Sequence, residues 1–157
     1  RGARRLALEG RVLREGVHPE VELAAGAAAV ALAEEDEEMP SRALEELTAA
    51  LGGWPGHGEA HLQRGRAWLL AADGARRAGA DGRLESAKAA EDFDAARAAF
   101  PESLTAQHLR GVARFGAGDY DGALGDWRSL IAADASWDTE DLRAWMKQAE
   151  ERKGSRK

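Results

Sequence analysis

The sequence predicts an all-α fold, and three observations support this expectation. Ala and Gly are frequent, there are only four prolines, and β-branched residues are few, a composition that favours helices over strands. Apolar residues recur three and four positions apart through most of the chain, which places them on one side of a helix. No segment has the strict alternation of a strand. The 157 residues suffice for one hydrophobic core, so we treat residues 1–157 as a single domain.

Two helices are expected in the N-terminal part of the chain. Residues 3–15 carry an apolar side among arginines and glutamates, and Gly16 ends this segment. The second helix begins at Pro19, because proline is favoured at the first helical position. Its residues are mostly small, so neighbouring helices can approach it closely. The acidic run that follows, residues 34–38, predicts a solvated helix end rather than a cation site.

Six further helices follow, and their ends are marked by turn and capping residues. Pro40 begins the first of them, the glycine-rich stretch 74–82 predicts a loop, and Asp138 is the expected N-cap of the last. The predicted ranges are 40–51, 59–72, 84–100, 103–117, 120–134 and 138–153.

Parts of the chain repeat one another. In three segments a small residue is followed four positions later by a large one, and three further on by another apolar one. These triplets are Ala43, Leu47 and Ala50; Ala89, Phe93 and Ala96; and Ala123, Trp127 and Leu130. Upstream of the last two triplets, an Arg-Gly pair precedes an alanine by two positions, at Arg64-Gly65 and at Arg110-Gly111. Such periodicity is typical of helical repeat proteins.

The pattern resembles the tetratricopeptide repeat (TPR) family, whose unit is an antiparallel helix pair of about 34 residues. The resemblance implies a TPR-like α-solenoid with units at about 19–55, 58–101 and 103–136, and a capping helix at about 138–153. The implied repeat core consists of Gly65, Trp68, Ala89, Phe93, Gly111, Ala123, Trp127 and Leu130. The sequence departs from the family at Ala135, where proline is usual, and by extra residues between the helices of the middle unit. The competing interpretation is an unrelated helical bundle.

In the TPR family, partners usually bind the concave groove formed by the first helix of each pair. The resemblance assigns to this groove Glu59, Leu62, Arg66, Leu69, Thr105, His108, Val112 and Phe115, with further positions near Leu23, Ala27 and Val30. The Lys, Asn and Arg clamp of chaperone-binding members has no counterpart at the matching positions, which argues against that subclass. Arg66 and His108 are the strongest candidates, because neither occupies a repeat core position.

Composition and motifs exclude several other classes of function. A net charge of −6 disfavours nucleic acid as a partner, since phosphate binding needs a basic face. There are no cysteines, and His57 and His61 lack a third ligand nearby, so we expect no metal and no cofactor. No catalytic motif stands out. The longest apolar run is about half of a membrane span, so we expect no membrane insertion. The compartment is left open, with the cytoplasm favoured.

We therefore expect a non-catalytic scaffold or adaptor that binds a peptide or protein segment in a concave groove. The chain begins with Arg1 rather than Met, so we expect a piece of a longer protein. One alternative is accordingly the regulatory or docking segment of a larger signalling enzyme, such as a bacterial kinase. A second alternative is a self-assembling structural subunit, and the oligomeric state is left open.

Overall fold

The computed structural model describes residues 40–155, which form six α-helices without a strand in that range. A short 3₁₀ helix, η1 (Ala135–Trp137), precedes the last α-helix. The α-helices are α3 (Pro40–Gly53), α4 (Gly58–Arg77), α5 (Arg83–Ala99), α6 (Leu104–Ala117), α7 (Tyr120–Ala133) and α8 (Glu140–Ser155). The helices predicted at 3–15 and 19–35, the acidic run, and the groove positions near Leu23, Ala27 and Val30 lie outside the described residues.

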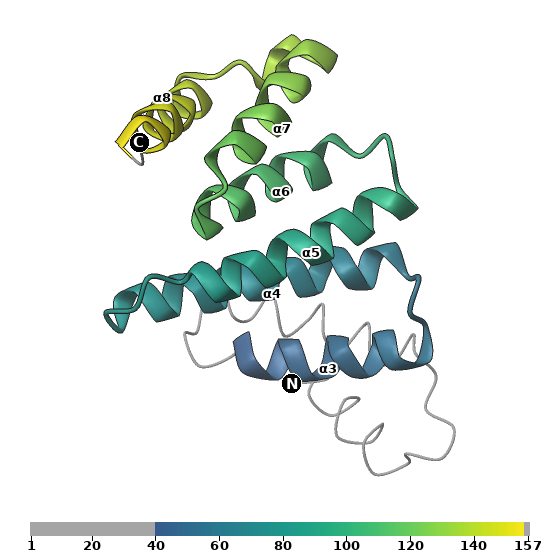
Figure 1. Ribbon diagram of the computed structural model, residues 1–157. Helices are drawn as coiled ribbons and strands as arrows, with labels where there is room; N and C mark the ends of the chain where they lie inside the picture. The colour runs from purple at the N-terminus through teal and green to yellow at the C-terminus, as the bar shows by residue number, and fades with distance from the viewer. Residues whose placement is uncertain (1–39, 156–157) are drawn as a thin grey trace.

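Each helix packs against the next one in the chain, from α3 to α8, and α4 also contacts α6. Figure 1 shows the helices stacked in chain order, with α3 and α8 at opposite ends of the described part. The prediction of an all-helical fold with repeat-like packing of consecutive helices is confirmed for this part of the chain. The hairpin of α4 and α5 and the hairpin of α6 and α7 form the centre of the stack.

In each of these two hairpins, the first helix crosses the second at a glycine that faces an aromatic ring. A Cβ atom added at Gly65 of α4 would lie 2.6 Å from the ring of Phe93 on α5. A Cβ atom added at Gly111 of α6 would lie 2.5 Å from Nε1 of Trp127 on α7. Because these distances are too short for any side chain, only glycine permits the observed approach of the helices. The same crossing is thus built twice, at the positions that the repeat pattern aligned.

Each crossing also holds an arginine–aspartate pair. Arg64 donates from Nε and Nη2 to the two carboxylate oxygens of Asp92, at 2.9 and 2.8 Å. Arg110 donates in the same way to Asp126, at 3.1 and 2.6 Å. Both aspartates are buried, and the hydrogen bond to Asp126 raises the pKa of Arg110 above its ordinary value. On α3, Glu46 occupies the same register, one position before a buried apolar residue, and is itself buried.

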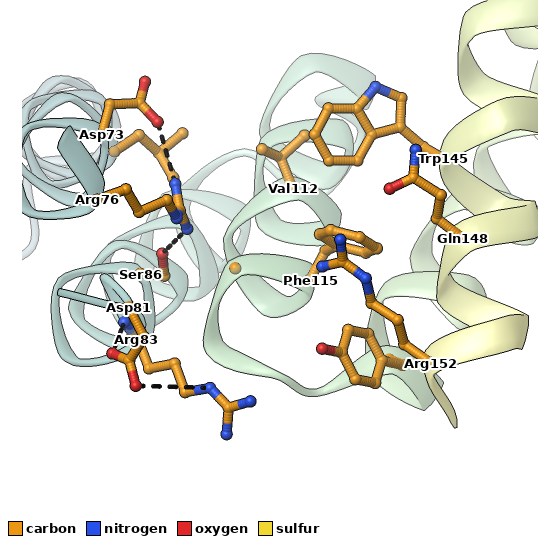
Figure 2. Close-up of a pocket in the computed structure, with 13 residues that line it drawn as sticks. Asp73, Arg76, Asp81, Arg83, Ser86, Val112, Phe115, Trp145, Gln148 and Arg152 are labelled. Atoms are coloured by element: carbon orange, nitrogen blue, oxygen red, sulfur yellow. Dashed lines mark hydrogen bonds and ion pairs between the residues drawn. The ribbon is translucent and has the colours of Figure 1, made fainter. Parts of the chain in front are cut away.

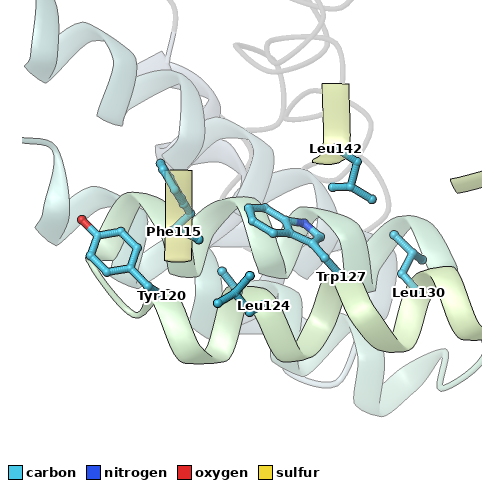
Figure 3. Close-up of a cluster of buried hydrophobic side chains, with 8 residues drawn as sticks. Phe115, Tyr120, Leu124, Trp127, Leu130 and Leu142 are labelled. Atoms are coloured by element: carbon cyan, nitrogen blue, oxygen red, sulfur yellow. The ribbon is translucent and has the colours of Figure 1, made fainter. Parts of the chain in front are cut away.

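The largest hydrophobic cluster lies between α6, α7 and α8 (Figure 3). Trp127 is fully buried at its centre. Its ring lies near that of Phe115, with 6.1 Å between the centroids. From α8, Leu142 and Ala149 cover this cluster, as a capping helix would. An ion pair of 2.8 Å between Lys153 and Asp121 also ties α8 to α7 and raises the pKa of Lys153.

The structure corrects one predicted boundary by more than two residues. Helix α4 continues through Gly74 to Arg77, so only the second half of the expected 74–82 loop is non-helical. Gly74 lies at an open position where an added Cβ would touch nothing, and its cost of about 1 kcal/mol relative to alanine is tolerated. Asp73 and Arg76, three positions apart, pair across this turn at 3.0 Å. The extra residues of the middle unit therefore lengthen the hairpin.

The start of α8 also differs from the prediction. The side chain that caps this helix belongs to Thr139, whose Oγ1 accepts from the backbone N–H of Leu142 at 3.2 Å. Asp138, the expected N-cap, instead pairs with Arg143 at 2.8 Å. Before it, Asp134 caps η1 by accepting a hydrogen bond from the N–H of Ser136, and α8 begins at Glu140.

Candidate functional site

The longer hairpin creates a cleft of about 640 Å³ on one side of the stack. Its bounds are the joined ends of α4 and α5, the face of α6, and the inner face of α8 (Figure 2). This volume falls within the range of pockets that hold a drug-sized ligand. The cleft can therefore hold a short stretch of peptide.

One wall of the cleft is polar and comes from the end of the α4–α5 hairpin. Arg76 donates from Nη1 to Asp73 at 3.0 Å and from Nη2 to Ser86 Oγ at 3.2 Å. Arg83 lies 3.9 Å from the carboxylate of Asp81. Both arginines of this wall therefore have a carboxylate beside them. The helices meet closely here, since a Cβ atom at Gly116 of α6 would overlap Ser86 and Arg76.

The opposite wall and the floor are aromatic, with one cation. Trp145 of α8 is 44% exposed and meets the ring of Phe115 edge-on, with 5.0 Å between centroids. The guanidinium of Arg152 lies over the ring of Phe115, 4.9 Å from its centroid. Such a cation–π contact holds the planar guanidinium in place while its N–H edge stays accessible. Within residues 40–155, no carboxylate pairs with Arg152.

The structure brings three of the predicted groove residues together in the cleft. Leu69, Val112 and Phe115 line it. The other five predicted positions lie elsewhere along α4 and α6. Leu62 packs against the cluster around Phe93.

The two strongest sequence candidates do not line the cleft. Arg66 is exposed on α4, with no ion pair inside the described range. His108 is half-buried on α6, where its ring lies against Trp137 with 5.2 Å between centroids. Burial lowers the pKa of His108 below its ordinary value of 6.5. Of the remaining positions, Glu59 accepts a hydrogen bond from Gln63, and Thr105 is exposed.

His57 and His61 serve the fold in this structure. His57 caps α4, where its Nδ1 accepts from the N–H of Ala60 at 3.1 Å. The ring of His61 contacts Asp92 at 3.0 Å and the carbonyl oxygen of Pro55 at 2.8 Å. In the part of the chain that the structure describes, no group of three metal-ligating side chains occurs.

Sequence reasoning did not identify half of the cleft. It missed the polar wall, because the stretch containing Arg76 was read as the start of a loop. It also missed Trp145 and Arg152, because the last helix was assigned only the role of a cap. The unequal lengths of the two hairpins could have indicated the polar wall, because the extra turns of the longer hairpin must extend beyond the shorter one.

None of the helices formed by residues 40–155 has the length and apolar character required to span a bilayer. No protein-family model matches the chain, and no curated protein matches it either.

Proposed function

We propose that this chain is a non-catalytic protein-interaction module of TPR-like architecture, which binds a peptide or protein segment in the cleft. The observation that carries the proposal is the open face shared by α4, α6 and α8. Leu69, Val112 and Trp145, one from each of these helices, line the same cleft. The repeated Gly65–Phe93 and Gly111–Trp127 crossings support the TPR-like assignment.

The chemistry of the cleft supports binding rather than catalysis. Its two aspartates lie beside arginines, and Ser86 accepts a hydrogen bond from Arg76 rather than contacting a base. What it offers a partner is the exposed ring of Trp145 with polar groups at the rim of the cleft. Aromatic residues and arginine are the side chains that dominate the binding energy of protein interfaces.

The proposal is tested by filling the cleft. Gln148 is exposed on α8 and lines the cleft, whereas Lys147 is exposed on the same helix but does not line it. Dodecapeptides would be selected on the wild-type chain from a random phage-displayed library, and their affinities measured by fluorescence anisotropy. Gln148→Trp should weaken binding by about tenfold or more, because about 1.4 kcal/mol of lost contact suffices. The matched control, Lys147→Trp, should bind like the wild type.

Two results would contradict the proposal. One is a selection without enrichment over an unrelated helical protein. The other is a set of selected peptides that bind the Gln148→Trp variant as well as they bind the wild type.

A further inference from the structure

Arg152 is the one charged residue of α8 that lines the cleft, and it has no ion pair within residues 40–155. Its neighbours on this helix are engaged by α7: Lys153 pairs with Asp121, and Glu150 pairs with Arg128. Arg152 instead lies over the Phe115 ring at the cleft, with no carboxylate partner in residues 40–155. The cleft therefore holds one uncompensated positive charge, in a chain whose net charge is −6.

The remaining cleft charges do not cancel this one. Across the cleft, Arg76 and Arg83 lie beside Asp73 and Asp81, so that wall is close to neutral as a whole. Three arginines and two aspartates line the cleft, and Arg152 is the member in excess. A partner with the complementary charge is therefore acidic at this point. A carboxylate also suits the guanidinium geometrically, because the two planar groups form paired hydrogen bonds.

The apolar surface next to Arg152 adds a second requirement. The Phe115 ring contacts both the Trp145 ring and the Arg152 guanidinium. Because both groups lie against the same ring, a partner that binds Arg152 also lies next to the exposed Trp145. In an extended peptide, side chains two positions apart point to the same side. One such pair can therefore place a carboxylate at Arg152 and an apolar group at Trp145.

We propose that the cleft recognises an acidic peptide segment in which an aspartate or glutamate, placed at Arg152, lies two positions from an aromatic or aliphatic residue placed against Trp145. This inference rests on the proposed function, since it names the partner class of the same cleft. It makes Arg152 the residue that selects charge and Trp145 the residue that selects the apolar side chain.

The test uses the full chain and the random dodecapeptide library as its probe. Peptides selected on the wild type should be enriched in the acidic–x–apolar spacing. Arg152→Gln should weaken them about tenfold, the size expected for losing one charge-assisted pair. Arg152→Lys keeps the charge without the planar fork and should fall between the two. Lys147→Gln removes one charge from the same helix outside the cleft, and should bind like the wild type.

A charge reversal and a salt series sharpen the test. A new selection on Arg152→Glu should replace the acidic residue of the motif by lysine or arginine. For the wild type, raising the salt concentration from 50 to 500 mM should weaken binding, since an exposed pair is screened. Circular dichroism melting curves of all variants show whether they fold like the wild type.

The outcomes separate the inference from the proposed function. Peptides that lose affinity for Gln148→Trp but bind Arg152→Gln like the wild type would overturn the inference and leave the function standing. Selected peptides without the acidic bias would do the same. If the library yields no binder, both proposals fail together.

Discussion

The two central hairpins have the same crossing but different ends. In both, a glycine leaves room for an aromatic ring, and an arginine donates two hydrogen bonds to a buried aspartate. We call each of these arginine–aspartate pairs an arginine clamp. At their joined ends they diverge: α6 and α7 meet in a tight turn at Gly118, whose φ is 87°, whereas α4 and α5 run on beyond this point. The difference shows that two parts of the repeat have different roles. The crossing fixes the packing, and the residues of α4 and α5 beyond the crossing line the cleft.

The hairpins differ also in the ring at the crossing and in what covers it. Phe93 belongs to a small cluster between α4, α5 and α6, whereas Trp127 is the centre of the large cluster that α8 closes. The indole N–H of Trp127 has no hydrogen-bond acceptor among residues 40–155. The larger ring therefore contributes volume rather than a polar contact.

The largest expected effect comes from removing these rings. Trp127→Ala should lower the free energy of unfolding by about 4 kcal/mol, and Phe93→Ala by about 3 kcal/mol, because both leave cavities in fully buried positions. Trp127→Phe makes the second crossing like the first and should cost clearly less than the alanine variant. Urea denaturation followed by circular dichroism measures all three. A loss below about 1 kcal/mol for Trp127→Ala would contradict the aligned register of the hairpins.

The arginine clamps are expected to contribute less than Trp127 and about as much as Phe93. Arg110→Met should lower the free energy of unfolding by about 3 kcal/mol, because it leaves the buried Asp126 carboxylate with less compensation. The double variant Arg110→Met, Asp126→Leu should recover most of this loss, since neither charge is then buried. The same urea titration gives both values. A double variant that is as unstable as Arg110→Met would mean that the arginine acts through packing, not through charge.

The two clamps differ in the groups that contact the buried aspartate. Asp92 is contacted by Arg64 and by the ring of His61. Asp126 is contacted by two arginines, since Arg114 donates to it at 2.9 Å in addition to Arg110. These pairs link helices that the apolar pattern alone also predicts to be neighbours. The clamps therefore reinforce a register that packing already favours.

The repeat crossing could be read from the sequence because it depends on few residue types. A glycine and an aromatic residue recur at matched positions, at Gly65 with Phe93 and at Gly111 with Trp127, and both pairs meet in the structure. The clamps could not be read in the same way, because an aspartate before an aromatic residue looks like an ordinary surface residue. Its burial becomes evident only when the partner helix brings an arginine to it.

The cleft was predictable only on its α4 and α6 sides. Leu69, Val112 and Phe115 follow from the repeat register. The other walls depend on how far α4 continues past Gly74 and on how α8 docks, and neither follows from local preference. A glycine usually weakens a helix, yet the exposed Gly74 does not end α4. The contact of Arg152 with Phe115 joins helices that are distant in sequence, and helical periodicity carries no information about such contacts.

The smallest expected effect distinguishes the hairpins by pH. His108 of α6 corresponds to Leu62 of α4, because each lies three positions before the crossing glycine. Burial against Trp137 lowers the pKa of His108 below 6.5, so the unfolded chain binds a proton more readily than the folded chain. The stability contributed by neutral His108 is therefore complete above pH 6.5 and is lost as the pH falls from there towards the lowered pKa. His108→Leu gives the second hairpin the residue of the first and should remove this component. Between pH 7.5 and pH 5.5 the melting temperature should thus fall further in the wild type than in His108→Leu, because the two proteins differ only at this position. An equal fall in both proteins would show that the environment of His108 does not disfavour its protonated form.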